Sequence, residues 1–190
     1  MPFDSRIAFL VLIGLVACER LVELVLSRRN AARAFARGGV EAESRGFYAL
    51  MITAHALFLV AAPLEVFLAG RPFRPGLAAL MLALAAGAMA LRYWAVATLG
   101  DRWNTRVIVV PGEPAVASGP YRLVRHPNYL AVVVEMVALP LVHGAWATAL
   151  AASAANALIL ARRIRHEEAA LERASDYAAR LGGRGRFLPL

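Results

Sequence analysis

The stretch YLAVVVEMVALPLVHGAWATALAASAANALILA, residues 129–161, contains two apolar segments separated only by His143 and Gly144. The segments cover residues 129–142 and 145–161, and both lack the alternation of apolar and polar residues that is typical of a half-buried strand. Because helices joined by so short a connection run antiparallel, the stretch predicts a tight helical hairpin. Its apolar character indicates a lipid bilayer as the surrounding solvent.

Three longer apolar segments precede this hairpin, at residues 7–26, 47–69 and 77–99. About 20 apolar residues cross a bilayer as a helix, because lipid offers no partners for free backbone groups. The chain of 190 residues is 60% apolar with a mean hydropathy of +0.58, which is outside the mix of a soluble domain. We therefore expect an all-α integral membrane protein with about five transmembrane helices, a C-terminal helical hairpin and a cytoplasmic tail helix.

The chain is expected to form a single domain over residues 1–190. Residues 1–99 supply three N-terminal spans, and residues 100–190 supply a loop, the hairpin and the tail. The tail, residues 162–181, keeps helical spacing among its charges and is expected to continue the fifth span until GGRG at 182–185.

Arginine placement predicts the orientation. The chain has no lysine, and 16 of its 21 arginines fall in residues 27–46, 100–128 and 162–190. The positive-inside rule puts these segments in the cytoplasm and the N-terminus outside. The net charge of +8 then matches the anionic face of a membrane better than nucleic acid.

Several function classes are disfavoured by missing patterns. The single cysteine, Cys18, excludes an internal disulfide, and His126 has no second histidine or cysteine at metal-ligand spacing. The sequence has no GxGxxG after a strand, no GxxxxGK[ST] and no GxSxG, which argues against a Rossmann enzyme, a P-loop ATPase and an α/β-hydrolase. Five spans without an inverted repeat also disfavour a transporter.

Ionisable side chains at membrane depth are costly, so they are either functional or paired. Near the end of the first span, an acid and base cluster is expected, either as a site or as an ion pair at the headgroup level. Glu135 fits a pocket and a paired structural role equally well. The ionisable side chains at this depth are Glu19, Arg20, Glu23, His55, Glu65, Arg92 and Glu135.

The polar stretch SGPYRLVRHPNYL, residues 118–130, lies between two apolar segments. Gly119 and Pro120 predict a turn, and Pro127 keeps His126 out of helical geometry, which frees backbone groups for a ligand. A headgroup anchor is the alternative. RRIRHEE at residues 162–168 is expected on the same face, although its charges alone are typical of a solvated helix. His55 and His143 are not expected to join this site.

GPYRLVRHPNYL at residues 119–130, followed by EEAAL at 167–171, resembles the isoprenylcysteine carboxyl methyltransferase family and related membrane phospholipid methyltransferases. The hallmark of that family is RHPxYxG with a distal EE pair, and the resemblance covers residues 100–172, with weaker similarity at ERLVELVLSRRN, residues 19–30. Ala131 stands where the family has glycine, so its methyl group is expected to narrow the approach of the backbone to a ligand.

The resemblance implies S-adenosylmethionine as cofactor and Arg163 in substrate binding. A site that combines a carboxylate with arginine, histidine and tyrosine groups suits the sulfonium, ammonium and carboxylate of that cofactor. The implied cofactor-binding residues are Glu113, Pro114, Ala115, Val116, Tyr121, His126, Pro127, Asn128, Tyr129 and Glu167.

Within the family, residues 102–130 look most like small bacterial members associated with type III polyketide synthases, which O-methylate alkylpyrones or alkylresorcinols. We therefore expect an O-methyltransferase of the bacterial inner membrane, with a cytoplasmic active site and a lipophilic or prenylated acceptor such as prenylcysteine. An ionised acceptor needs no general base, whereas for an amine or ordinary phenol His126 and Glu135 are the candidates. Membrane lipids are expected around the protein, with no metal and no obligate protein partner.

Three alternatives stay open at this point. The first is a phosphatidylethanolamine N-methyltransferase, the second a non-enzymatic membrane protein of the same fold, and the third a membrane reductase that binds NADPH.

Overall fold

Local sequence signals start the first four long helices in the computed structural model, which describes residues 4–189. Asp4 and Ser44 cap the first two helices by accepting backbone N–H groups, and Pro75 and Pro127 occupy first turns, where no N–H donor is needed. The long helices are α1 (Ser5–Ala36), α2 (Arg45–Leu68), α3 (Pro75–Leu99), α4 (Pro127–Leu141) and α5 (Trp146–Ala174). The shorter elements are β1 (Val40–Glu41), β2 (Ile108–Val109), α6 (Tyr177–Leu181) and 3₁₀ turns at Gly100–Arg102 and Gly119–Arg122.

The mainly helical fold and the hairpin of α4 and α5 are confirmed, with two corrections to the helix limits. Helix α1 continues ten residues past the predicted end of the first span. The tail is not one helix to Leu181, because α5 ends at Ala174. The next residue, Ser175, has an extended backbone, and its hydroxyl donates to the carbonyl of Leu171. A separate helix, α6, follows that break.

Apolar surface on the helices indicates a membrane. Within the described residues, Arg45–Leu68 and Pro75–Arg102 are long and apolar enough to span a bilayer, and only 17% and 22% of their apolar windows are buried. The core helix of a soluble protein would be mostly buried, so these faces suit contact with lipid. Helix α4, with 15 residues, is shorter, and the count of five spans stays a prediction.

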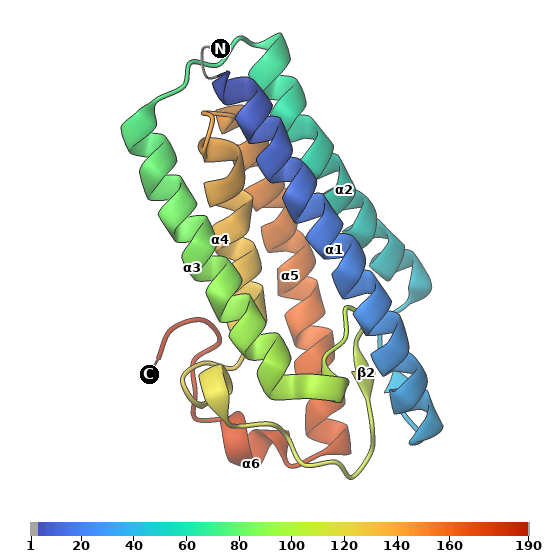
Figure 1. Ribbon diagram of the computed structural model, residues 1–190. Coiled ribbons are helices and arrows are strands. Elements are labelled where there is room, and N and C mark those ends of the chain that lie inside the picture. Colours follow the sequence, from blue (N-terminus) through green and yellow to red (C-terminus); the bar gives the residue numbers. More distant parts are fainter. Residues whose placement is uncertain (1–3, 190) are drawn as a thin grey trace.

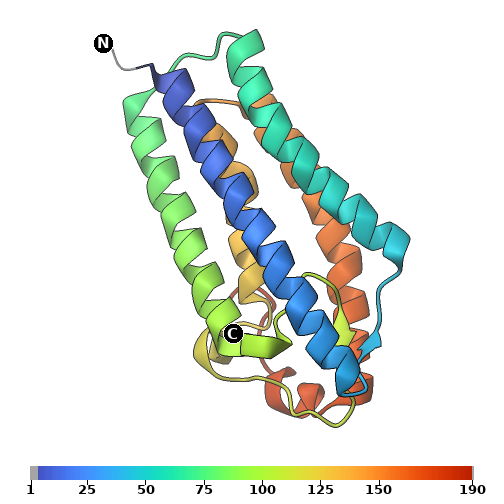
Figure 2. The same cartoon turned by 45° about the vertical axis from the view of Figure 1, so that its right-hand side comes forward.

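The five long helices run roughly side by side (Figures 1 and 2). The start of α1 and the α2–α3 and α4–α5 connections lie at one end, called here the N-terminal end; β2 and α6 lie at the other, the α6 end (Figure 1). At the α6 end, β1 and β2 pair antiparallel, with Val40 opposite Val109, and so tie the α1–α2 connection to the loop after α3.

The apolar core occupies the half of the bundle near the N-terminal end. Its members on α1 are Phe9, Ile13 and Val16, and on α2 they include Phe58 and Val66, all of them buried. Residues nearer the α6 end of both helices are missing from this cluster. Close packing of one half therefore leaves the other half free to form a cavity.

Glu65 has a structural role at the N-terminal end. Its carboxylate accepts the backbone N–H groups of Ala147 and Thr148 at 3.1 and 2.7 Å and pairs with Arg71 at 2.6 Å. A carboxylate at these free N–H groups satisfies the first turn of α5. Glu65 is thus one of the paired charges expected at membrane depth.

Candidate functional site

A cavity of about 510 Å³ lies between α1, α2, α4 and α5 in the half of the bundle near the α6 end. This volume is within the range of roughly 300–1,000 Å³ that is usual for small-molecule sites. At the α6 end its walls come from the loops after α3, from α5 and from the tail, and they carry charged side chains such as Glu113, Arg163 and Glu167 beside apolar ones; this part is called here the polar half. Toward the core its walls are the apolar side chains Ala17, Leu21, Leu24, Ile52, Ala56, Leu59, Val132, Ile159 and Leu160, which define the apolar chamber.

Two residues of the apolar chamber, one on α1 and one on α2, are also exposed. Leu21 of α1 lines the cavity and is nevertheless 63% exposed, and Ala56 of α2 also lines it and is exposed. The chamber is thus bordered by side chains that lipid would contact. A molecule with an apolar tail could occupy the chamber while its head reaches the polar half.

The polar half is built on the segment that precedes α4. His126 has φ −127° and ψ 60°, outside helical geometry as predicted, because Pro127 begins the helix. Gly119 has φ +54°, and a Cβ there would overlap the side chain of Thr98. Gly119 and Pro127 therefore place residues 125–129, called here the RHP segment, across the end of the cavity.

Glu168 holds the RHP segment to α5 and to the C-terminal tail. Its carboxylate, buried to 6% exposure, lies 3.0 Å from His126 Nε2, 3.0 Å from Arg125 Nη1 and 2.6 Å from Arg186 Nη2. The backbone N–H groups of Arg125 and His126 also donate to the carbonyls of Gly185 and Arg186. Adjacent residues of a helix project about 100° apart, so only one acid of the EE pair can face the cavity.

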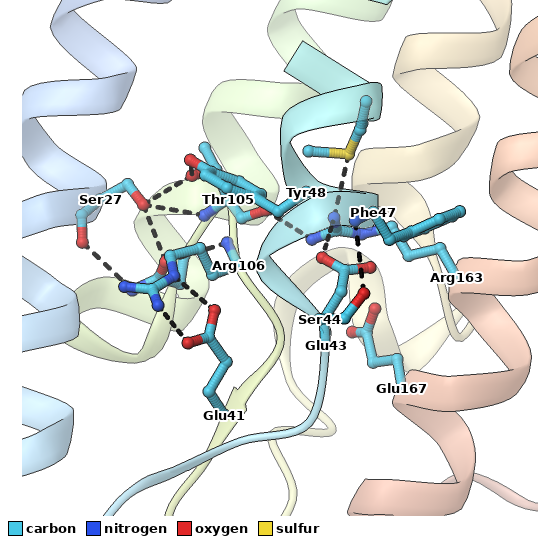
Figure 3. Close-up of polar contacts among 12 residues, drawn as sticks. Ser27, Glu41, Glu43, Ser44, Phe47, Tyr48, Thr105, Arg106, Arg163 and Glu167 are labelled. Carbon is cyan, nitrogen blue, oxygen red and sulfur yellow. Dashed lines mark hydrogen bonds and ion pairs between the residues drawn. The ribbon is translucent and has the colours of Figure 1, made fainter. Parts of the chain in front are cut away.

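That acid is Glu167, which lines the cavity and accepts a hydrogen bond from the hydroxyl of Tyr129. Arg163 Nε donates to the same hydroxyl at 2.7 Å. The salt bridge of Arg163 is with Glu43, at 2.9 Å, rather than with Glu167 (Figure 3). Burial raises the pKa of Glu43 even though the guanidinium of Arg163 opposes this. Arg163 therefore joins the α1–α2 connection to the RHP segment.

The loop after α3 is held against α1 and α2 by a second set of polar contacts (Figure 3). Arg106 pairs with Glu41 of β1, and its guanidinium lies 6.0 Å from the centre of the Tyr48 ring. The hydroxyl of Ser27 on α1 is 2.7 Å from that of Thr105. These contacts set the position of the cavity wall that residues 103–110 form.

The predicted loop contacts also lie at the cavity. Glu113 forms salt bridges with Arg37 and Arg102, each at 3.0 Å, and the N–H of Ala115 donates to Asp176 at 2.6 Å. Of the residues predicted to bind the cofactor, all but Pro127 line the cavity. They are Glu113, Pro114, Ala115, Val116, Tyr121, His126, Asn128, Tyr129 and Glu167, and Arg163 lines it too.

Pro127 and Ala131 are buried in α4, away from the cavity wall. Ala131 has 0% exposure and does not line the cavity in the described part of the chain. The expectation that its methyl group narrows the approach to a ligand stays a prediction, although this structure buries that methyl group away from the cavity wall.

A four-residue ion cluster, the buried quartet, stands where the polar half meets the apolar chamber. Arg92 Nη2 is 2.9 Å from Glu135, Arg20 Nη2 is 3.0 Å from Glu135, and Arg20 Nη1 is 2.5 Å from Glu23. Arg92 also lies 3.4 Å from Glu23 and 3.4 Å from Asn128 Oδ1. Buried ions persist only when they are paired in this way. The local cluster expected on α1 is therefore part of a larger one, drawn from three helices.

The two predicted general bases are both engaged. Glu135 accepts from two guanidinium groups, and His126 Nε2 faces Glu168. His55, which was not expected at the site, lines the same cavity as His126. The sequence could not show this, because α2 approaches α4 and α5 only in the folded bundle.

The amino-acid sequence is similar to those of known proteins. The sequence model of the isoprenylcysteine carboxyl methyltransferase (ICMT) family matches residues 79–173, which run from α3 through α4 to the end of α5. The chain is 35% identical over 167 residues to the uncharacterized protein YpbQ of Bacillus subtilis, covering 86% of this chain and 96% of that protein. It is 31% identical over 153 residues to an uncharacterized protein of Haemophilus influenzae, covering 80% and 88% respectively.

Proposed function

Because the chain belongs to the isoprenylcysteine carboxyl methyltransferase family, a family of membrane methyltransferases, we propose that it transfers a methyl group from S-adenosylmethionine to an oxygen of a lipophilic acceptor. The observation that carries the proposal is one cavity whose lining is charged toward the α6 end and apolar toward the core. A polar cofactor and an acceptor with a lipid tail need these two environments, with their reacting atoms together.

The residues of the polar half fit the cofactor. The carboxylate of Glu167 suits an ammonium or ribose hydroxyl group, and the RHP segment places Asn128 and the ring of Tyr129 beside it. When bound, S-adenosylmethionine supplies an activated methyl group on a sulfonium. Tyr129, held by Arg163 and Glu167, would keep the wall of the site rigid while the acceptor approaches.

The apolar chamber fits the tail of the acceptor. An acceptor that enters between α1 and α2 would pass Leu21 and Ala56 and bring its head toward the buried quartet. The chamber would exclude water from the reacting atoms and align them, which are the main contributions expected for an in-line displacement. With the arginine-rich segments in the cytoplasm, the polar half opens on the cytoplasmic side of a bacterial inner membrane.

Binding of S-adenosylhomocysteine to the detergent-purified protein, measured by calorimetry, tests the cofactor site. Glu167→Ala is expected to weaken binding by at least about tenfold, since a charge-assisted hydrogen bond contributes about 1.5–3 kcal/mol. Glu172→Ala, at an exposed position of the same helix, is the matched control and should bind as the wild type does. No binding to the wild type would contradict the proposal.

Methyl transfer to labelled acceptors tests the reaction. Membranes that contain the protein are expected to methylate a long-chain alkylresorcinol or alkylpyrone on oxygen. Methylation of phosphatidylethanolamine instead, at nitrogen, would overturn the assignment of an oxygen acceptor while keeping the cofactor.

A further inference from the structure

His55 on α2 lines the cavity, and one of its ring nitrogens has no hydrogen-bond partner among the described residues. Its Nδ1 lies 2.8 Å from the carbonyl oxygen of Met51, one turn earlier in the same helix. A carbonyl only accepts, so Nδ1 carries the hydrogen, and in the neutral ring Nε2 keeps its lone pair. No hydrogen bond found among residues 4–189 uses Nε2, although the imidazole lines the cavity. The ring is thus held in the tautomer that can take up a proton from the cavity.

The position of His55 is the boundary between the two halves of the cavity. Met51 Sδ lies 2.9 Å from Arg163, which holds Tyr129 of the RHP segment. His55 is one turn further from the α6 end, a rise of about 6 Å along the helix. Beyond it lie Ala56 and Leu59 of the apolar chamber, whereas Ile52 of the same chamber lies level with Met51. The head of an acceptor whose tail fills the chamber would therefore lie beside His55.

The charges at this boundary carry an excess of one negative charge. Two guanidinium groups face three carboxylates, and both oxygens of the third, Glu19, are buried without a hydrogen bond, although Arg20 lies 3.3 Å away. This formal excess of negative charge opposes the binding of an anionic head. The charged groups around His55 are Glu19, Arg20 and Glu23 on α1, Arg92 on α3, Glu135 on α4, and Arg163 on α5 with its partner Glu43.

We propose that the acceptor enters as a neutral hydroxyl compound, a phenol or an enol, and that Nε2 of His55 takes its proton during methyl transfer. The inference rests on the proposed function. The O–H bond breaks and the proton passes to Nε2, while an electron pair of the oxygen forms the new bond to the methyl carbon. The carbon–sulfur bond breaks with its pair left on sulfur, which loses its positive charge. The products are a methyl ether, a neutral thioether and an imidazolium that returns its proton to water.

The two general bases predicted from the sequence are less suited to this role, and Glu135 does not line the cavity in the described part of the chain. Glu135 is held by Arg20 and Arg92, so protonating it would leave two buried cations without their partner. His126 Nε2 faces Glu168 and keeps the RHP segment in place. His55 is the imidazole of the cavity wall whose Nε2 has no protein partner within residues 4–189.

The test compares the wild type with His55→Asn on two acceptors of equal tail length. Asparagine can still donate to the Met51 carbonyl, but it has no basic nitrogen. With a long-chain alkylresorcinol, the variant is expected to lose about 10²–10⁴-fold in kcat, the usual contribution of a general base. With a nitro-substituted alkylphenol, which ionises by itself near neutral pH, the loss should be much smaller. The wild-type rate should fall as the pH drops and His55 becomes protonated, and the variant should lack this fall.

His166→Asn, at an exposed position of α5, is the matched control and should keep the wild-type rate. A His55→Asn variant within about threefold of the wild-type kcat on the alkylresorcinol, or one equally impaired on both acceptors, would overturn the assignment. Calorimetry with S-adenosylhomocysteine separates the two levels. If the wild type neither binds it nor methylates either acceptor, the proposed function fails; if the wild type does both and His55→Asn changes nothing, only the role of His55 fails.

Discussion

Replacing Glu168 by alanine is expected to destabilise the protein strongly, because one buried carboxylate joins three separate segments. It holds Arg125 and His126 of the RHP segment, α5 itself, and Arg186 of the C-terminal tail, at 2.6–3.0 Å. Glu168→Ala leaves His126, which is 4% exposed, without its partner. It also removes the carboxylate contact between the tail and the RHP segment, so the loss of one side chain affects the whole polar half.

The expected loss of stability in Glu168→Ala follows from the burial of this carboxylate and its partners. Removing one partner of a buried ion pair costs about 3–5 kcal/mol. The Arg186 side chain is 47% exposed and is solvated when released, so the lower limit of about 3 kcal/mol applies here. For a chain of this size, about 2–4 °C in Tm per kcal/mol corresponds to a fall of about 6–12 °C.

Thermal unfolding of the detergent-purified protein, followed by intrinsic tryptophan fluorescence, measures this change. Glu168→Gln keeps an acceptor oxygen, so its Tm should fall by less than that of Glu168→Ala. Glu172→Ala, exposed on the same helix, should leave Tm unchanged. A Glu168→Ala protein that melts within about 2 °C of the wild type would refute the reasoning, since that shift corresponds to at most about 1 kcal/mol.

Two further predictions concern the cavity wall. The N–H of Ala115 and the guanidinium of Arg180 hold the pKa of Asp176 below its usual value, so this loop contact should persist above about pH 4 and be lost only in stronger acid. Between about pH 5 and about pH 7, titration of Asp176 should therefore cause no change in the affinity of the wild type for S-adenosylhomocysteine. Calorimetry should show that Asp176→Ala binds more weakly than the wild type by less than about tenfold throughout this range. A pH-dependent step in the wild-type affinity that Asp176→Ala removes would contradict this. Ala131→Gly should lower the free energy of unfolding by about 0.5–1 kcal/mol, measured by thermal unfolding, because glycine destabilises a helix interior. The affinity for S-adenosylhomocysteine should stay unchanged, because Ala131 is buried away from the cavity. Tighter binding would show that the methyl group of Ala131 does restrict the site.

The helices and one wall of the site could be predicted because they depend on local order. Apolar length predicts α2 and α3 within two residues of their limits, and Pro127 predicts the non-helical His126. The resemblance to the family brings Glu167 and Tyr129 to one site, and the structure places them in hydrogen-bond contact. Their role in cofactor binding stays a prediction.

Contacts between distant segments could not be predicted in this way. Glu43 gives no signal in the sequence, yet it pairs with Arg163 across the bundle. The two acids of the EE pair look alike as letters, and only the rotation of α5 sends Glu167 to the cavity and Glu168 to the RHP segment. The same holds for His55, which was not expected to join this site and lines the cavity.

By itself, the sequence determined the apolar helices, the hairpin and the presence of a polar motif beside it, since each depends on residues close together in the chain. Only the tertiary structure decided which charges neutralise one another and which nitrogen stays free. In a medium that does not solvate ions, every buried charge must find a partner, and the partners of Arg92 and Arg163 come from other helices and connections. Within the described residues, Nε2 of His55 at the cavity wall stays without a partner. The chemistry proposed for this protein can be tested at that nitrogen.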